Sequence, residues 1–105
     1  MNQIRQGDYL FIRVNSIPIE FNKLDESNIV GRGEKTGHTH FLQGEGIKLY
    51  RHNSDGSQLA YAQIERPVLL IHQQHKPLPI EEGTYLIKRQ RELNVKSKEA
   101  LYVSD

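Results

Sequence analysis

Short runs of β-branched and aromatic residues, each closed by turn-forming residues, recur along this chain and constrain its fold class. The clearest run is residues 9–14, where alternate side chains fall on opposite faces of an extended strand. The clearest turn is residues 53–57, because its Asp-Gly step adopts positive φ at little cost. Helical periodicity is hard to find. The pattern predicts an all-β fold, a small antiparallel sandwich or barrel of about seven or eight short strands.

The other predicted strands are residues 17–21, 29–30, 40–43, 47–52, 58–65, 68–71 and 84–92. Pro18 lacks an N–H, so we expect residues 17–21 to form an edge strand. Residues 68–71 are apolar on both faces and predict a central buried strand. The polar residues 22–28 predict a loop, and residues 76–79, with two prolines, predict a rigid extended connection.

Chain length and composition limit the organisation of the molecule. The 105 residues predict a single β domain spanning 1–105, with 94–105 as a loosely packed tail. The absence of cysteine excludes disulfides and thiolate metal sites and fits a cytoplasmic protein. No segment approaches the roughly 20 apolar residues of a membrane helix, so we expect no membrane partner.

Four of the five histidines fall into two tight pairs. His38 and His40 are separated by one residue, and on an extended strand both imidazoles would point to the same side. His72 and His75 are three residues apart and can converge only if the strand ends or bulges between them. The apolar run stops at Ile71, which makes that convergence possible.

Paired imidazoles on neighbouring strands are suited to a divalent transition metal such as zinc, nickel, iron or copper. The sequence therefore predicts one metal site built from His38, His40, His72 and His75. Three ligands with an open position would suit catalysis, whereas four closed ligands would suit a structural site. The alternative is that these histidines form a polar strand face or are satisfied by hydrogen bonds.

Glu45 is the one catalytic candidate, as a further ligand or as a general base beside a metal-bound water. Its position between two glycines also suits a solvent-facing turn residue. Tyr85 could orient a substrate near the metal, although a core position is the alternative. The chain lacks the phosphate-binding glycine motifs and the Gly-x-Ser-x-Gly nucleophile motif, so it leaves the question of enzymatic activity open.

The segment His38-Thr39-His40, followed after four residues by Glu45, resembles the first motif of the cupins. That resemblance implies a small double-sheet β barrel in which His38, His40 and Glu45 are metal ligands. The second cupin motif ends in a ligand histidine, and here no histidine follows Gly83.

The whole chain also resembles small uncharacterised bacterial and phage-type proteins. The shared features are a Gly-His-Ser/Thr-His segment at 37–40, a His-x-x-His-x-Pro segment at 72–77 and a closing Gly-x-Tyr-x₄-Gln-Arg-Glu segment at 83–92. This resemblance supports the choice of histidines and implies no particular activity.

Two further functions compete with metal binding by a small enzyme-like domain. One is a protein-interaction module in a multi-protein or mobile-element system, with structural histidines, a small-molecule or protein partner, and possible homo-oligomerisation. The other is single-stranded nucleic-acid binding through Lys88, Arg89 and Arg91, with base stacking on tyrosines and phenylalanine at 9, 11, 50 and 61. The second is disfavoured because the net charge is only +1 and glutamates interleave with these cations.

Overall fold

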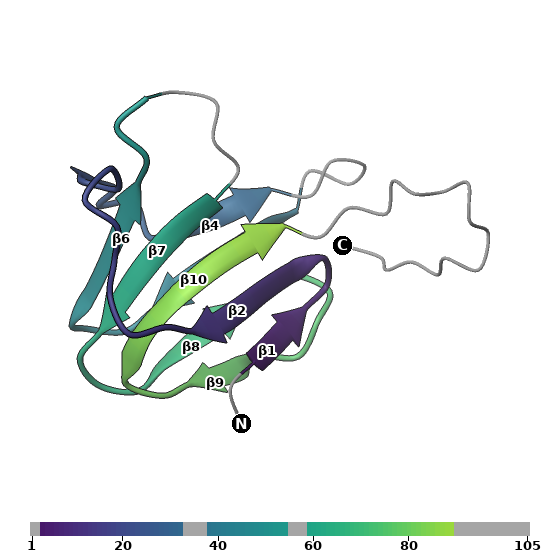
Figure 1. Cartoon of the computed structure of the whole chain (residues 1–105). Coiled ribbons are helices and arrows are strands. Elements are labelled where there is room, and N and C mark those ends of the chain that lie inside the picture. Colours follow the sequence, from purple (N-terminus) through teal and green to yellow (C-terminus); the bar gives the residue numbers. More distant parts are fainter. Residues whose placement is uncertain (1–2, 33–37, 55–58, 90–105) are drawn as a thin grey trace, which may run out of the picture.

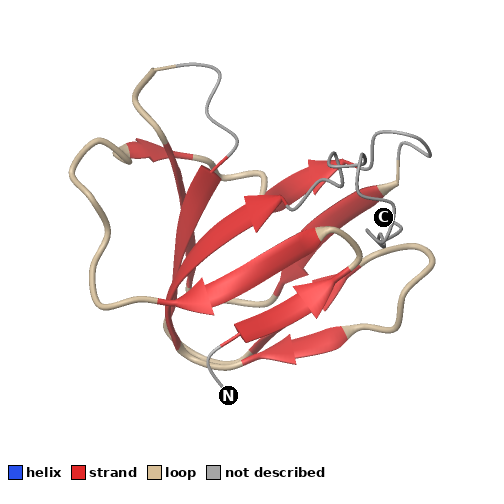
Figure 2. Ribbon diagram, turned by 45° about the vertical axis from the view of Figure 1, so that its right-hand side comes forward, coloured by secondary structure: helices blue, strands red, loops and turns tan. Residues whose placement is uncertain are grey.

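The computed structural model describes residues 3–32, 38–54 and 59–89, which form two antiparallel sheets packed face to face (Figures 1 and 2). One sheet has six strands in the order β1-β2-β10-β7-β6-β3, and the other has four in the order β4-β5-β8-β9. The prediction of a small all-β sandwich is confirmed.

The strands are β1 (Gln3–Gln6), β2 (Tyr9–Arg13), β3 (Lys23–Leu24), β4 (Ile29–Arg32), β5 (Thr39–Gln43), β6 (Ile47–Arg51), β7 (Leu59–Ile64), β8 (Val68–Ile71), β9 (Leu78–Ile80) and β10 (Gly83–Arg89). The predicted strands at 40–43, 47–52, 58–65 and 84–92 correspond to β5, β6, β7 and β10. Residues 55–58 and 90–105, including the predicted tail at 94–105, lie outside the described residues.

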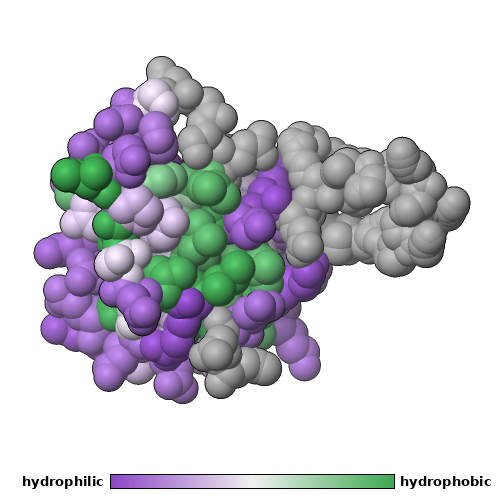
Figure 3. All heavy atoms as spheres, viewed as in Figure 1, coloured by the Kyte–Doolittle hydropathy of each residue, from purple (hydrophilic) through white to green (hydrophobic). Residues whose placement is uncertain are grey.

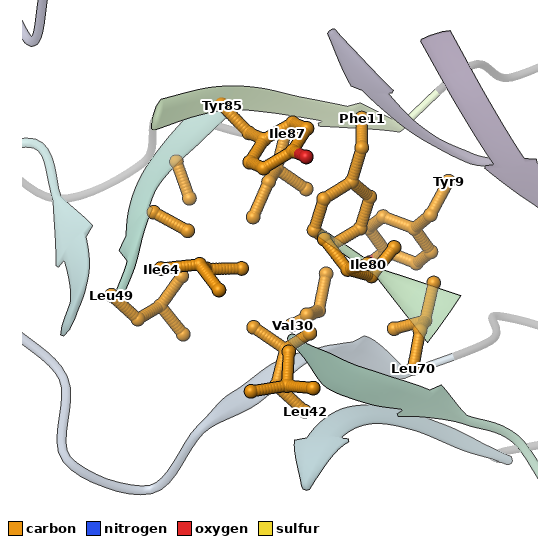
Figure 4. Close-up of a cluster of buried hydrophobic side chains, with 13 residues drawn as sticks. Tyr9, Phe11, Val30, Leu42, Leu49, Ile64, Leu70, Ile80, Tyr85 and Ile87 are labelled. Atoms are coloured by element: carbon orange, nitrogen blue, oxygen red, sulfur yellow. The ribbon is translucent and has the colours of Figure 1, made fainter. Parts of the chain in front are cut away.

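Alternation of side chains explains how each sheet builds one face of the core. On β2, Tyr9 and Phe11 are buried while Leu10 and Ile12 are half-buried on the opposite face. Figure 4 shows the two layers meeting, with Phe11 and Tyr85 from the six-stranded sheet facing Leu70 from the other. The core cluster comprises Tyr9, Phe11, Val30, Leu42, Leu49, Ala60, Ala62, Ile64, Val68, Leu70, Ile80, Tyr85 and Ile87.

The predicted edge strand at 17–21 is wrong. The Phe21 N–H donates to the Pro18 carbonyl at 3.0 Å, so the chain turns here. Phe21 is buried, and its ring packs edge-on against those of Tyr61 and His52 at 4.6 and 5.0 Å between ring centres. The short strand in this region is β3, which lies inside the predicted loop 22–28 and pairs with β6. Burial of the Phe21 ring therefore favours this turn over the extended strand that the sequence pattern indicates.

Two further strands, β1 and β9, were not predicted. The polar sequence of β1 pairs with β2 across the two-residue turn Gly7-Asp8, where Gly7 has a φ of 63°. That geometry suits a hairpin with glycine in the first turn position. On β9, Pro79 is tolerated because the strand pairs with β8 alone and lies at a sheet edge.

The prediction for residues 68–71 is right in position and wrong in burial. β8 lies between β5 and β9, as expected of a central strand. Val68 and Leu70 face the core, but the side chain of Leu69 is 41% exposed on the outer face. Only one face of this sheet is covered by the other sheet.

Candidate functional site

The four paired histidines meet at one end of the sandwich and are referred to here as the histidine cluster. His40 and His72 are buried, and His38 and His75 are half-buried. The ring centres of His72 lie 4.2 Å from His40, 4.5 Å from His75 and 5.4 Å from His38. The centres of His40 and His75 are 6.4 Å apart. The two histidine pairs therefore converge, as the sequence predicts.

The register between β5 and β8 brings the two pairs together. Phe41 lies opposite Ile71 and Leu42 opposite Leu70, so the next antiparallel step places His40 opposite His72. β8 ends at Ile71, and the loop to β9 carries both His72 and His75. The Thr39 N–H donates to Gln73 Oε1 at 2.9 Å, which fixes this loop to the start of β5.

Gln6 of β1 links the cluster to the other sheet. Its Nε2 donates to the carbonyls of Leu70 and Lys76, both at 3.1 Å, at the two sides of the β8–β9 loop. With its amide nitrogen occupied in this way, Gln6 directs Oε1 at His40 Nδ1, 3.1 Å away. Figures 1 and 2 both show the β1–β2 turn beside the β8–β9 loop.

The hydrogen bonds assign opposite tautomers to the two buried histidines. Because Gln6 Oε1 can only accept, a neutral His40 carries its proton on Nδ1 and keeps the lone pair on Nε2. At His72 the Gln74 N–H donates to Nδ1 at 3.0 Å, so a neutral His72 carries its proton on Nε2. The Nε2 atoms of both rings are buried, as is Nδ1 of His38.

Tyr9 forms the wall of the cluster on the side of the six-stranded sheet. Its ring centre lies 4.7 Å from that of His40, and its hydroxyl fills the space where a side chain on Gly31 would begin. The Arg89 guanidinium lies 5.4 Å from the centre of the same ring. Arg89 also pairs with Asp8 at 2.8 Å, and both side chains are only 12% exposed.

The distances agree with a metal site in spacing but not in the orientation of every ligand. When four imidazole nitrogens bind a tetrahedral ion at about 2.1 Å, the centres of the four rings lie roughly 5 Å apart. The distances observed between ring centres in the cluster, 4.2–6.4 Å, are close to this value. In the described part of the chain, however, no group of three or more His, Asp or Glu side chains has the arrangement needed to hold an ion as it stands. His72 supplies one physical reason, since its Nδ1 accepts a backbone hydrogen bond and its Nε2 carries a proton.

Glu45 is not part of the cluster. It lies in the turn Gly44–Gly46 beyond the opposite end of β5, where both glycines have positive φ. Its side chain is 85% exposed and pairs with Arg66 at 3.3 Å. The solvent-facing alternative is therefore the one observed, and Glu45 does not join the histidines. Tyr85 is a core residue whose hydroxyl donates to the Glu81 carbonyl at 2.8 Å, and burial raises its pKa.

The residues considered for nucleic-acid binding do not form one surface. Tyr9 and Phe11 are buried in the core and cannot stack on bases. Tyr50 and Tyr61 lie opposite each other on β6 and β7, on the outer face of the six-stranded sheet. Arg89 is paired with Asp8, and Arg91 lies outside the described residues.

Sequence reasoning missed Gln6 and Tyr9 as members of this site. Gln6 comes from a strand that was not predicted, and its role depends on contacts 34, 64 and 70 residues away. The Gly7-Asp8 hairpin signal was the one feature that could have placed Gln6 beside Tyr9. No sequence pattern near Gln6 or Tyr9 shows that either side chain faces the histidines.

The chain belongs to a family described as Domain of unknown function (DUF8820), whose model matches residues 5–90. The matched region contains all four histidines of the cluster together with Gln6 and Tyr9. No curated protein matches the chain, and no solved structure does. Within the described residues, the structure has no helix able to span a membrane.

Proposed function

We propose that the histidine cluster binds one divalent transition metal ion, with His38, His40, His72 and His75 as its ligands. The observation that carries this proposal is the gathering of four imidazoles, two of them buried, from two segments that are distant in sequence. Imidazole nitrogen is a preferred ligand of zinc, nickel, iron and copper.

His40 already has the features of a metal-binding imidazole. Metal-bound histidines usually donate their second ring N–H to a protein oxygen, which fixes the tautomer. Gln6 Oε1 is that acceptor here, and it leaves His40 Nε2 with a lone pair. Gln6 would therefore orient this ligand through the hydrogen bond to Nδ1.

His72 would have to change its hydrogen bonding to become a ligand through Nε2. The Gln74 N–H would have to release Nδ1, and the proton on the ring would then reside there. Metal binding is therefore expected to move the backbone of residues 73–75.

The cupin resemblance supports this site only through His38 and His40, because Glu45 lies elsewhere. The cysteine-free composition favours the cytoplasm as the place where the protein works.

The test is elemental analysis of the purified, untagged protein after incubation with each metal and removal of excess ion. About one equivalent of one of these metals is expected for a single site. His38→Ala and His72→Ala should each lower the bound metal by similar factors, because both belong to one site. His52→Ala is the matched control, since His52 contacts Phe21 and Ser54 outside the cluster.

Two results would contradict the proposal. A protein that acquires no metal on titration would leave the histidines as hydrogen-bonding and packing residues and favour the interaction-module alternative. Loss of metal on changing only one of the two pairs would reject the shared site. Movement of residues 73–75 can be followed through the Gln74 amide resonance, which should shift on addition of metal while remote amides do not.

A further inference from the structure

The loop between β8 and β9 carries two of the four histidines and is held at both ends by one side chain. Gln6 Nε2 donates to the carbonyl of Leu70, near the end of β8, and to that of Lys76, at 3.1 Å in each case. His72 and His75 lie between these two anchor points. The loop can therefore rearrange between Leu70 and Lys76 while both of its ends stay attached to β1.

One backbone hydrogen bond inside the loop decides which nitrogen of His72 carries the proton. The Gln74 N–H donates to His72 Nδ1 at 3.0 Å. A neutral imidazole that accepts at Nδ1 has its proton on Nε2, and Nε2 of this ring is buried. A protonated ring nitrogen has no lone pair to offer a metal ion. While the Gln74–His72 hydrogen bond is present, His72 is therefore unable to bind a metal through Nε2.

His72 lies at the centre of the histidine cluster, so its tautomer affects the whole site. Its ring centre is 4.2 Å from that of His40, 4.5 Å from that of His75 and 5.4 Å from that of His38. The centres of His40 and His75 are farther from each other, at 6.4 Å. An ion bound by all four rings needs an unprotonated nitrogen on this central ring. The Gln74–His72 hydrogen bond therefore keeps the cluster closed to such an ion.

The hydrogen bond can open without loss of the other contacts of the loop. Gln73 and Gln74 are exposed, and the loop runs along the border of the molecule beside the β1–β2 turn (Figure 1). Figure 3, in the same view, shows hydrophilic residues bordering an apolar middle. Rotation of the peptide between Gln73 and Gln74 turns the N–H towards water, which can accept its hydrogen bond. Because the α-carbons keep their places, the Thr39 N–H can still donate to Gln73 Oε1.

We infer that the Gln74–His72 hydrogen bond is an autoinhibitory contact that regulates metal binding by the histidine cluster. It holds His72 in the tautomer that cannot bind, and it must open before the fourth ligand is available. The apparent affinity is then lowered by the fraction of molecules in which this bond is open. Metal loading also changes the exposed backbone at Gln73 and Gln74, so this loop reports the metal-bound state at the surface. The inference rests on the proposed function, because it requires His72 to be a ligand.

The first experiment compares zinc affinities by competition with a chelator. Gln74→Pro has no N–H at this position and should bind zinc about fivefold more tightly, because the metal-free form loses a stabilising hydrogen bond. Gln74→Ala is the matched control: it keeps the N–H and should stay within about twofold of the wild-type affinity. Circular dichroism establishes that both variants are folded. If Gln74→Pro binds zinc no more tightly than Gln74→Ala, the inference is overturned.

A second measurement uses the wild-type chain and so does not depend on the folding of a variant. Nuclear magnetic resonance detects the scalar coupling across an N–H···N hydrogen bond, here between the Gln74 amide nitrogen and His72 Nδ1. We expect this coupling in the metal-free protein and its loss with one equivalent of zinc, when the ring proton of His72 moves to Nδ1. Persistence of the coupling in the zinc-loaded protein would overturn the inference.

The failure of this inference differs from the failure of the proposed function. Zinc that binds to the wild type and is lost in His72→Ala, without opening of the Gln74–His72 hydrogen bond, would reject the autoinhibitory contact and leave the metal site in place. A chain that binds no zinc, either as wild type or as Gln74→Pro, would reject both.

Discussion

Gln6 and His40, 34 residues apart in the chain, are joined by a buried hydrogen bond of 3.1 Å between Oε1 and Nδ1. The same amide donates to the carbonyl of Leu70 in the opposite sheet and to that of Lys76 in the loop after β8. One side chain therefore joins the two layers of the sandwich and sets the tautomer of a buried histidine.

Gln6→Leu should destabilise the protein by about 2–4 kcal/mol, because it leaves two carbonyls and one ring N–H buried without this partner. Chemical denaturation measures the change. Gln3→Leu, at an exposed position on the same strand, is the control and should change stability by less than about 0.5 kcal/mol. Equal effects of the two substitutions would show that the Gln6 hydrogen bonds are not stabilising.

The tautomers of His40 and His72 should be opposite in the metal-free protein. Long-range proton–nitrogen correlation spectra of the neutral rings are expected to show protonated Nδ1 in His40 and protonated Nε2 in His72. In Gln6→Leu the signal of His40 should shift towards a mixture, while that of His72 should not. Finding the same tautomer in both wild-type rings would refute the assignment.

The Asp8–Arg89 pair should contribute far more than the Glu45–Arg66 pair. Asp8→Ala leaves the Arg89 guanidinium in a site that is only 12% exposed, so a loss of about 3–5 kcal/mol is expected. Glu45→Ala breaks a pair whose side chains are 85% and 58% exposed, and a loss below about 1 kcal/mol is expected. Thermal and denaturant unfolding compare the two, and losses of similar size would contradict the difference in burial.

Asp25 should make part of the stability sensitive to acid. Burial by itself would raise its pKa, but hydrogen bonds from the side chain and backbone of Ser27 and from Arg51 outweigh burial and lower the pKa below its ordinary value of 3.8. The stabilising contribution of the Asp25 carboxylate is therefore complete at pH values above its pKa in the unfolded chain, about 4. It is lost as the pH falls through the lower pKa of Asp25 in the folded protein.

Asp25→Asn removes this titration and should flatten the fall in unfolding free energy below about pH 4. The Arg51 guanidinium, which also donates to the carbonyls of Ile29 and Val30, would lose a charged partner in the variant. Its stability near neutral pH should therefore be lower as well. Unfolding curves collected from pH 2 to 7, with Glu26→Gln as an exposed control, measure both effects. An identical pH profile in wild type and Asp25→Asn would rule out this role.

Much of the sandwich was predictable because alternation and turn chemistry are local. The runs that became β6, β7 and β10 specify their conformation within a few residues, whereas the predicted Asp-Gly turn at 55–56 lies outside the described residues. The strand at 17–21 was predicted wrongly because the fate of Phe21 depends on Tyr61 and His52, which a local pattern cannot show. β9 was missed because proline disfavours a strand except at an edge, and edge position is a property of the whole sheet.

By itself, the sequence determined most of the extended runs and the grouping of four histidines into two pairs. Only the tertiary structure decided that the pairs share one site, that Glu45 lies outside it, and that Gln6 and Gln74 give His40 and His72 opposite tautomers. The physical reason is strand register: side-chain alternation fixes the two faces of a strand, but long-range pairing decides what each face meets.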